Sequence, residues 1–302
     1  MALVPMRNLM RHALANQYAV GYFEAWNMES LLAVIDAAEQ THSPVIIGFG
    51  GQFVGSTKRK IKENIYHYGN LGKAIAQHAK VPVALLLNEA HEVSMLMNGL
   101  QSGFNAIMLE GNGMPFKEFI EVNKYLVRTA HYFGADVEAE VGKLPDSDIA
   151  NNSINGGKKT DVDEAIYFVK ETAVDALAVA VGNVHLLENN KAELDFELIK
   201  TLRKNISVPL VLHGGTGIDT EDMKEAIRLG MCKVNVGTAL KRAYLDYIQS
   251  YLHHHNVKKM DPHNVIGRGG KEDMLCGARE AVTDVILGFI KTLGCENKAK
   301  LI

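Results

Sequence analysis

Eight short apolar runs, separated by longer segments with helical spacing, constrain this sequence more than any other feature. Each run holds several consecutive apolar residues, which is typical of strands that are buried on both faces. The segments between them place apolar residues three and four apart, as amphipathic helices do. The runs are Ala19–Ala25, Val45–Gly50, Val81–Asn88, Ala106–Gly111, Asp136–Gly142, Ala176–Gly182, Val208–Gly215 and Lys233–Thr238. The helical segments include Met28–Gln40, Asn70–Ala79, Phe116–Phe133, Asp163–Thr172 and Thr220–Leu229.

This alternation indicates an α/β fold with a parallel sheet, and eight such units close into a (β/α)8 TIM barrel. An open, doubly wound sheet is the alternative. The 302 residues, 47% of them hydrophobic, suffice for a large core, and no linker divides them. We therefore expect one barrel domain over residues 1–302. It should carry a C-terminal helical extension from about residue 239, formed by Ala239–His255 and Ala278–Leu293.

Composition excludes some classes of function. The formal net charge of -3 comes without a basic stripe, so we expect no nucleic-acid partner. No run of about 18 apolar residues predicts a membrane span, and Met1–Met10 lacks the apolar core of a signal peptide. Cys232, Cys276 and Cys295 form no close-spaced metal motif and are interpreted as free thiols. These features favour a cytoplasmic protein.

A long polar stretch, Lys143–Lys159, follows the fifth apolar run and contains two adjacent glycines. Loops of this length in compact domains are usually functional or mobile, although a plain surface insertion is the alternative. We expect this loop to close over a ligand, and Asp146 or Asp148 on it to be a candidate for proton transfer.

Polar side chains follow the apolar runs at the ends where barrel enzymes place their active sites. Two histidines after successive strands, together with a carboxylate, make a plausible site for a divalent transition metal. The alternative is that each histidine only hydrogen-bonds a loop. The residues at these ends are Asn88, Glu89, Glu110, Glu138, Glu140, His185, His213 and Asn235.

Two glycine-containing turns follow the last two strands, His213–Gly217 and Asn235–Thr238. Glycine lets the backbone approach a ligand and present N–H groups to an anion, and these two loops are the common phosphate site of such barrels. A single turn of this kind is usually only a tight turn, but two in adjacent positions predict phosphate binding. The residues concerned are Gly214, Gly215, Thr216, Asn235, Gly237 and Thr238.

Taken together, these motifs resemble the class II, metal-dependent fructose- and tagatose-bisphosphate aldolases. The similarity runs from about residue 4 to residue 290. The segments that carry it are Tyr18–Gly21, Ser43–Ile47, Val137–Gly142, Asp175–Gly182 with His185, Val208–Gly217 and Lys233–Val236.

The resemblance implies reversible aldol cleavage of a phosphorylated ketose. A divalent cation, most plausibly zinc, would act as a Lewis acid and stabilise the enediolate of dihydroxyacetone phosphate. His185 and His213 correspond to metal ligands, and Glu110 and Glu140 fall at positions used for a second or alternative metal site. The expected partner is a small phosphorylated sugar, and the expected assembly is a homodimer or homotetramer.

The sequence departs from the family pattern where the third strand normally ends His-x-Asp-His-Gly. Asn88 replaces the aspartate that acts as general acid and base, and Glu89 replaces a histidine ligand. An amide cannot exchange a proton usefully near neutral pH, whereas Glu89 can still bind metal, and two histidines with one glutamate form a known zinc set. His91 is a second candidate for the third ligand. We therefore assign catalytic roles to Asn88 and Glu89.

Other departures leave the reaction open. Glu24 stands in the opening Phe-Asn-Val-Asn-Asn pattern, and His263 replaces the basic residue that usually follows Asp-Pro in the tail. Besides the aldolase hypothesis, a family member that acts on another sugar phosphate or sugar acid, and a catalytically silent sugar-phosphate-binding protein, remain alternatives. Glu92 or a loop aspartate is a further candidate for the acid and base role.

Overall fold

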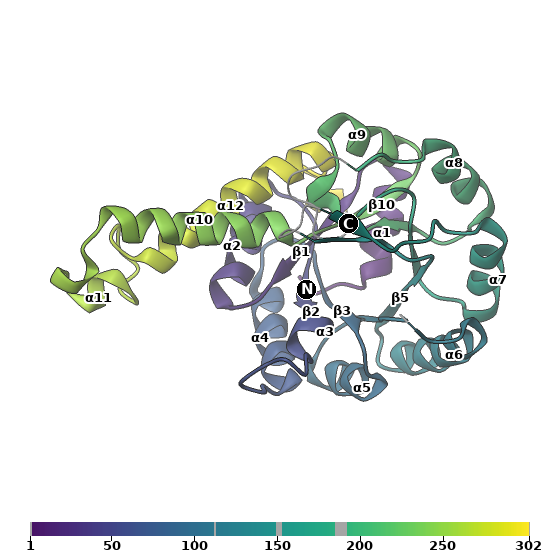
Figure 1. The fold of residues 1–302 in the computed structure, drawn as a ribbon, viewed down its shortest axis with the longest axis horizontal. Helices are drawn as coiled ribbons and strands as arrows, with labels where there is room; N and C mark the ends of the chain where they lie inside the picture. Colours follow the sequence, from purple (N-terminus) through teal and green to yellow (C-terminus); the bar gives the residue numbers. More distant parts are fainter. Residues whose placement is uncertain (1, 112, 149–152, 185–191, 302) are drawn as a thin grey trace.

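The computed structural model describes residues 2–111, 113–148, 153–184 and 192–301. Eight parallel strands form a closed barrel in the order β1-β10-β9-β8-β5-β4-β3-β2 (Figure 1). The barrel is closed because β1 pairs with β10 on one side and with β2 on the other. The TIM-barrel prediction is therefore confirmed, and the open sheet is wrong. The strands are β1 Val20–Ala25, β2 Val45–Gly50, β3 Val83–Ala90, β4 Ala106–Leu109, β5 Asp136–Val141, β8 Ala176–Val179, β9 Leu210–Leu212 and β10 Met231–Val236.

Helices surround the barrel and bury their apolar stripes against it (Figure 1). Those after the first seven strands are α2 Met28–Gln40, α3 Gly51–Val54, α4 Ile65–His78, α5 Val93–Ser102, α6 Phe116–Tyr132, α7 Val162–Thr172, α8 Phe196–Asn205 and α9 Thr220–Arg228. Five helices of the described residues lie outside the predicted segments, namely the ten-residue helices α1 Met6–Ala15, α5 and α8 and the four-residue helices α3 and α11 Pro262–Val265. No helix in the described part of the chain combines the length and the apolar content needed to cross a membrane.

Helix α1 lies across the N-terminal ends of the strands. It contacts β1, β3 and β10, and it buries Met6, Leu9, Met10 and Ala13 at helical spacing. Arg7 reaches the first residue of β5, where its backbone N–H and its guanidinium both bond the buried carboxylate of Asp136 at 2.7 and 2.5 Å. This helix therefore closes the barrel at the end opposite the predicted site.

The chain beyond β10 forms an arm that projects from the barrel (Figure 1). Its elements are α10 Thr238–His254, η2 Val257–Lys259, α11 Pro262–Val265 and α12 Met274–Leu293, with a last turn η3 at Ala299–Leu301. Helix α12 packs against α10, α2 and α9, and the Arg279 guanidinium bonds Asp36 of α2 at 2.5 and 2.6 Å. Helix α11, which carries His263, lies at the far end of the arm (Figure 1).

The polar stretch after β5 contains a small antiparallel pair, β6 Asp146–Asp148 and β7 Ser153–Asn155. Residues 149–152 between them lie outside the described residues. Closure of this loop over a ligand stays a prediction.

Candidate active site

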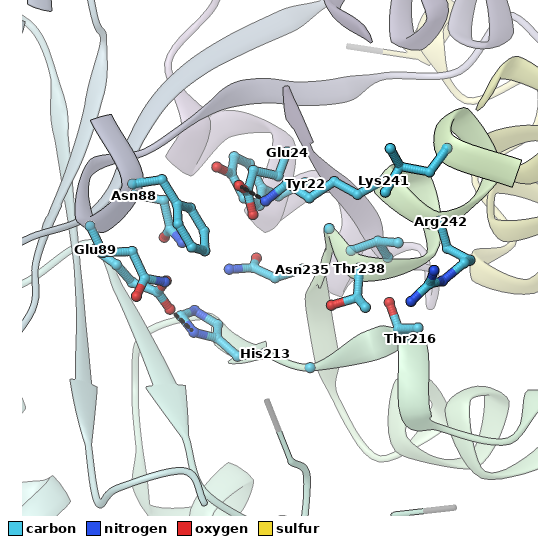
Figure 2. A pocket seen from close by; sticks show the side chains of 16 residues that line it. Tyr22, Glu24, Asn88, Glu89, His213, Thr216, Asn235, Thr238, Lys241 and Arg242 are labelled. Carbon is cyan, nitrogen blue, oxygen red and sulfur yellow. Dashed lines mark hydrogen bonds and ion pairs between the residues drawn. The ribbon is translucent and has the colours of Figure 1, made fainter. Parts of the chain in front are cut away.

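A pocket of about 270 Å³ opens at the C-terminal ends of the strands (Figure 2). Its wall combines residues from β1, β3 and β10, from α3 after β2, from the turn after β9, and from the start of α10. The lining residues are Tyr22, Glu24, Gln52, Phe53, Asn88, Glu89, His213, Gly214, Thr216, Asn235, Val236, Gly237, Thr238, Lys241, Arg242 and Leu245. The barrel thus brings together residues that are more than two hundred positions apart, such as Glu24 and Lys241.

His213 follows β9 directly, is 1% exposed, and is held from both sides of its ring. Its Nε2 lies 2.9 Å from Glu138 Oε1. Its Nδ1 lies 3.0 Å from Glu89 Oε1 and 3.4 Å from Glu140 Oε2. Glu138 and Glu140 both reach the ring because alternate residues of β5 point to the same face of the strand. The bond to Glu138 fixes the ring so that Nδ1 faces the other two carboxylates.

The carboxylates around His213 control its charge. Burial alone would lower the pKa of His213, but hydrogen bonds to Glu138 and Glu89 outweigh burial and raise this pKa to about 10. Burial, with the nearby charges of Glu89 and Glu110, raises the pKa of Glu140 to about 8 although His213 acts in the opposite direction. The imidazole and the carboxylates around it therefore form one electrostatically coupled cluster.

Behind His213, the interior of the barrel holds a fully buried ion pair. Lys233 Nζ lies 2.9 Å from Glu138 Oε2, and both side chains are 0% exposed. Burial would raise the pKa of Glu138, but Lys233 and His213 together hold it below the ordinary value. Lys233 also donates to Asn235 Oδ1 at 2.5 Å. Glu138 is thus a charged anchor for the ring of His213.

Glu89 reaches His213 through an unusual backbone conformation. Its φ of +50° is in the left-handed region, and the pairing of β3 with β4 shifts register between Leu87 and Ala90. Left-handed geometry costs energy for a residue with a side chain and clusters at functional sites. Gln52 of α3 donates to Glu89 Oε2 at 2.8 Å, which fixes the carboxylate on its other side.

The predicted phosphate loops lie at the other end of the pocket (Figure 2). Gly214 has a φ of +68°, and a Cβ there would lie 2.3 Å from the carbonyl oxygen of Val184. Gly215 does not line the pocket but packs beneath it, where a Cβ would lie 2.9 Å from the Asn235 carbonyl oxygen. The backbone N–H of Ala239 donates to Thr216 Oγ1 at 3.2 Å, which joins the two loops at the start of α10.

Two cations stand on the first turns of α10. Lys241 donates to Glu24 Oε1 at 2.6 Å, and its Nζ lies 4.1 Å from the centre of the Phe53 ring. Arg242 lies near Thr216 and Thr238 (Figure 2). Arg242 is therefore the pocket cation that lies beside the predicted phosphate loops.

Several other residues predicted for the site either do not line this pocket or lie outside the described residues. His185 lies outside the described residues. Glu110 lines a neighbouring cavity that it shares with Glu140 and Lys143. His91 and Glu92 are exposed, and Glu92 accepts a hydrogen bond from Ser94.

The structure also adds residues that sequence reasoning missed, namely Tyr22, Gln52, Lys241 and Arg242. Tyr22 was part of an apolar run, and Glu24 was noted only as a departure from a pattern. Their separation by two positions on a strand was the available signal that both face the same side. Lys241 and Arg242 follow a predicted phosphate loop, and their positive charge was a second signal.

The family model for class II fructose-bisphosphate aldolases matches residues 4–298, so the chain belongs to this family. A relative is YdjI of Escherichia coli (strain K12), an uncharacterized protein that is 38% identical over 241 residues, or 80% of this chain and 84% of YdjI. The crystal structure of the YdjI aldolase from Escherichia coli K12 has a TM-score of 0.80 at 33% identity and covers 98% of this chain and 99% of that one. The fructose-bisphosphate aldolase of Campylobacter jejuni shares the fold, with a TM-score of 0.77 at 20% identity over 98% of this chain and 97% of that one.

Proposed function

We propose that this member of the family is a metal-dependent lyase that reversibly cleaves a phosphorylated ketose. The observation that carries the proposal is the position of His213. One ring nitrogen is anchored by a buried carboxylate, the other faces two more, and the turn that follows His213 begins the phosphate loops. Membership of the family supports an aldolase-type reaction. The dependence on a metal and the identity of the substrate go beyond family membership and belong to the proposal.

The donor set suits a divalent cation, although the described residues show no group of three or more metal-binding side chains around a shared point. Histidine that bonds a carboxylate through one nitrogen and presents the other is the usual arrangement behind a metal ligand. Nitrogen and carboxylate oxygen together suit zinc and its neighbours. Glu89 and His213 would hold the cation, with His185, which lies outside the described residues, as a proposed third ligand. When bound, the cation would supply Lewis acidity at the substrate carbonyl.

The chain's own residues would bind and orient the substrate. Backbone N–H groups of Gly214 and Thr216, and the Thr238 hydroxyl at the start of α10, form the proposed phosphate site. Arg242 would add a cation at its edge. Asn88 would position a substrate hydroxyl by hydrogen bonding without transferring its proton.

Two observations favour a substrate other than a ketose bisphosphate. His263 belongs to α11, which lies at the far end of the arm (Figure 1), and it does not line the pocket of its own chain. The carboxylate of Glu24 is in the pocket wall and neutralises Lys241. We therefore propose a ketose or sugar acid with a single phosphate as the natural substrate.

Metal analysis combined with a condensation assay tests the function. Purified protein should hold about one divalent cation per chain after dialysis, and it should condense dihydroxyacetone phosphate with at least one aldehyde of a panel. His213→Ala should lose both properties because the anchored ring is gone. His263→Ala is the matched control and should keep both. If metal stays stoichiometric in His213→Ala, the metal site is misplaced, and if the wild type binds metal but condenses no aldehyde, the lyase proposal fails.

A further inference from the structure

Tyr22 is a pocket residue with a buried hydroxyl. It lies on β1, is 2% exposed, and pairs in register with Asn235 of the neighbouring strand β10. Both side chains line the pocket beside Asn88, Glu89 and His213 (Figure 2). Tyr22 therefore belongs to the same layer of the barrel as residues assigned to the substrate.

Three buried polar atoms of this pocket have no hydrogen-bond partner within the described residues. They are the Tyr22 hydroxyl, Asn88 Oδ1 and Asn235 Nδ2. A buried polar group without a partner costs about 1–3 kcal/mol, so a cluster of them calls for an explanation. Their shared position on one pocket wall indicates that a ligand satisfies them.

The surroundings fix what each atom offers. Asn235 gives its oxygen to Lys233, so its NH2 group is left as a donor. Burial, together with the charges of Glu24, Glu89 and Glu138, raises the pKa of Tyr22 well above the ordinary value, so the phenol keeps its proton. Lys233 lies 5.1 Å from the centre of the tyrosine ring and is already paired with Glu138. The wall therefore presents two donors, Tyr22 and Asn235, and one acceptor on Asn88.

We propose that Tyr22 contacts the substrate and donates a hydrogen bond to an oxygen of a bound α-hydroxyketone phosphate, next to the Asn235 amide. Asn88 accepts from the adjacent hydroxyl of the same ligand. Two donors beside one acceptor match a carbonyl next to a hydroxyl, whereas the phosphate group is assigned to the separate glycine turns of the pocket. This role rests on the proposed function, and it assigns to Tyr22 the specificity for the ketone end of the substrate.

Calorimetric binding of dihydroxyacetone phosphate and of inorganic phosphate tests the role of Tyr22. Tyr22→Phe removes only the hydroxyl and should weaken binding of dihydroxyacetone phosphate about tenfold, while binding of inorganic phosphate stays within about twofold of the wild type. Tyr18→Phe is the matched control because Tyr18 is equally buried but bonds His12 away from the pocket. It should change neither affinity.

Thermal unfolding without ligand separates this role from a structural one. Tyr22→Phe removes a buried polar atom that has no partner among the described residues, so its Tm should equal or exceed that of the wild type. The proposal is overturned if Tyr22→Phe binds dihydroxyacetone phosphate as tightly as the wild type, if it loses both ligands together with Tm, or if the wild type does not bind dihydroxyacetone phosphate. Failure of the proposed function is a different result, namely selective binding by the wild type without condensation or cleavage.

Discussion

The two ends of strand β5 each carry an acidic side chain, but the surroundings of the two side chains differ. At its first residue, Asp136 is buried and bonds both the backbone and the guanidinium of Arg7. At the other end, Glu140 faces His213 across 3.4 Å, beside a pocket whose wall includes polar atoms without partners among the described residues. A buried polar group that is hydrogen-bonded within the protein supports the fold, whereas a buried polar group without a partner is available to a ligand. This difference indicates that the N-terminal end of the barrel is arranged for stability and the C-terminal end for binding.

Of the variants proposed here, Asn88→Asp should change the catalytic rate most, because it restores a proton-transferring carboxylate to the pocket. General acid–base assistance is worth roughly 10²–10⁴-fold in rate, so cleavage of fructose 1,6-bisphosphate should rise by about that factor over a slow wild type. Steady-state cleavage of fructose and tagatose bisphosphates measures this. Asn70→Asp makes the same chemical change on the exposed surface of α4 and should have no effect. Rapid turnover by the wild type would show that Asn88 is no obstacle.

Gly215→Val should displace the predicted phosphate loops without changing Asn88 or Glu89. A Cβ at Gly215 would lie 2.6 Å from Val234 Cγ1 and 2.9 Å from the Asn235 carbonyl oxygen, so the phosphate loops must shift. Misplacement by about 1 Å can cost roughly 10²-fold in rate, so we expect condensation to slow by about that factor and phosphate affinity to fall with it. Gly288→Ala serves as the control because nothing lies within 4 Å of its Cβ position. Wild-type phosphate affinity in Gly215→Val would place the anion elsewhere.

Arg7→Met should have the smallest effect on activity and a clear effect on stability. It leaves Asp136 buried without its guanidinium partner, which should lower the free energy of unfolding by about 1–3 kcal/mol while condensation is unchanged. Urea unfolding followed by circular dichroism measures this, with the exposed Lys158–Glu164 pair as the control, because Lys158→Met should change little. Loss of activity in Arg7→Met at full stability would remove the distinction between the two ends.

The sequence predicted the parts of the molecule that depend on local pattern. The eight strands follow from consecutive apolar residues, and the tight turn after β9 follows from glycine, as the positive φ of Gly214 shows, while phosphate binding there stays a prediction. Helices α1, α5 and α8 were missed because each has only ten residues, although Asp195 caps the start of α8 and Gly103 ends α5 in the left-handed conformation. The division into domains and the assembly of copies stay predictions.

The chemistry of the pocket was harder to predict because it depends on distant side chains. The left-handed backbone of Glu89 leaves no trace in composition, and Tyr22 counts as apolar in any hydropathy pattern. The ion pair of Glu138 and Lys233 joins residues that are 95 positions apart. Such contacts follow from closure of the barrel and from side-chain reach, and neither is visible in a window of neighbouring residues.

The pairing of β1 with β10 also has a consequence for how the chain folds. Tyr22 and Glu24 are made early in synthesis, but their partners Asn235 and Lys241 emerge only when most of the chain is complete. Contacts between residues so far apart in sequence give a high contact order, which slows folding. We therefore expect the binding pocket to form late in folding, when β1, already paired with β2, also pairs with β10. Until then β1 presents an unpaired edge, which leaves this strand open to pairing with another chain.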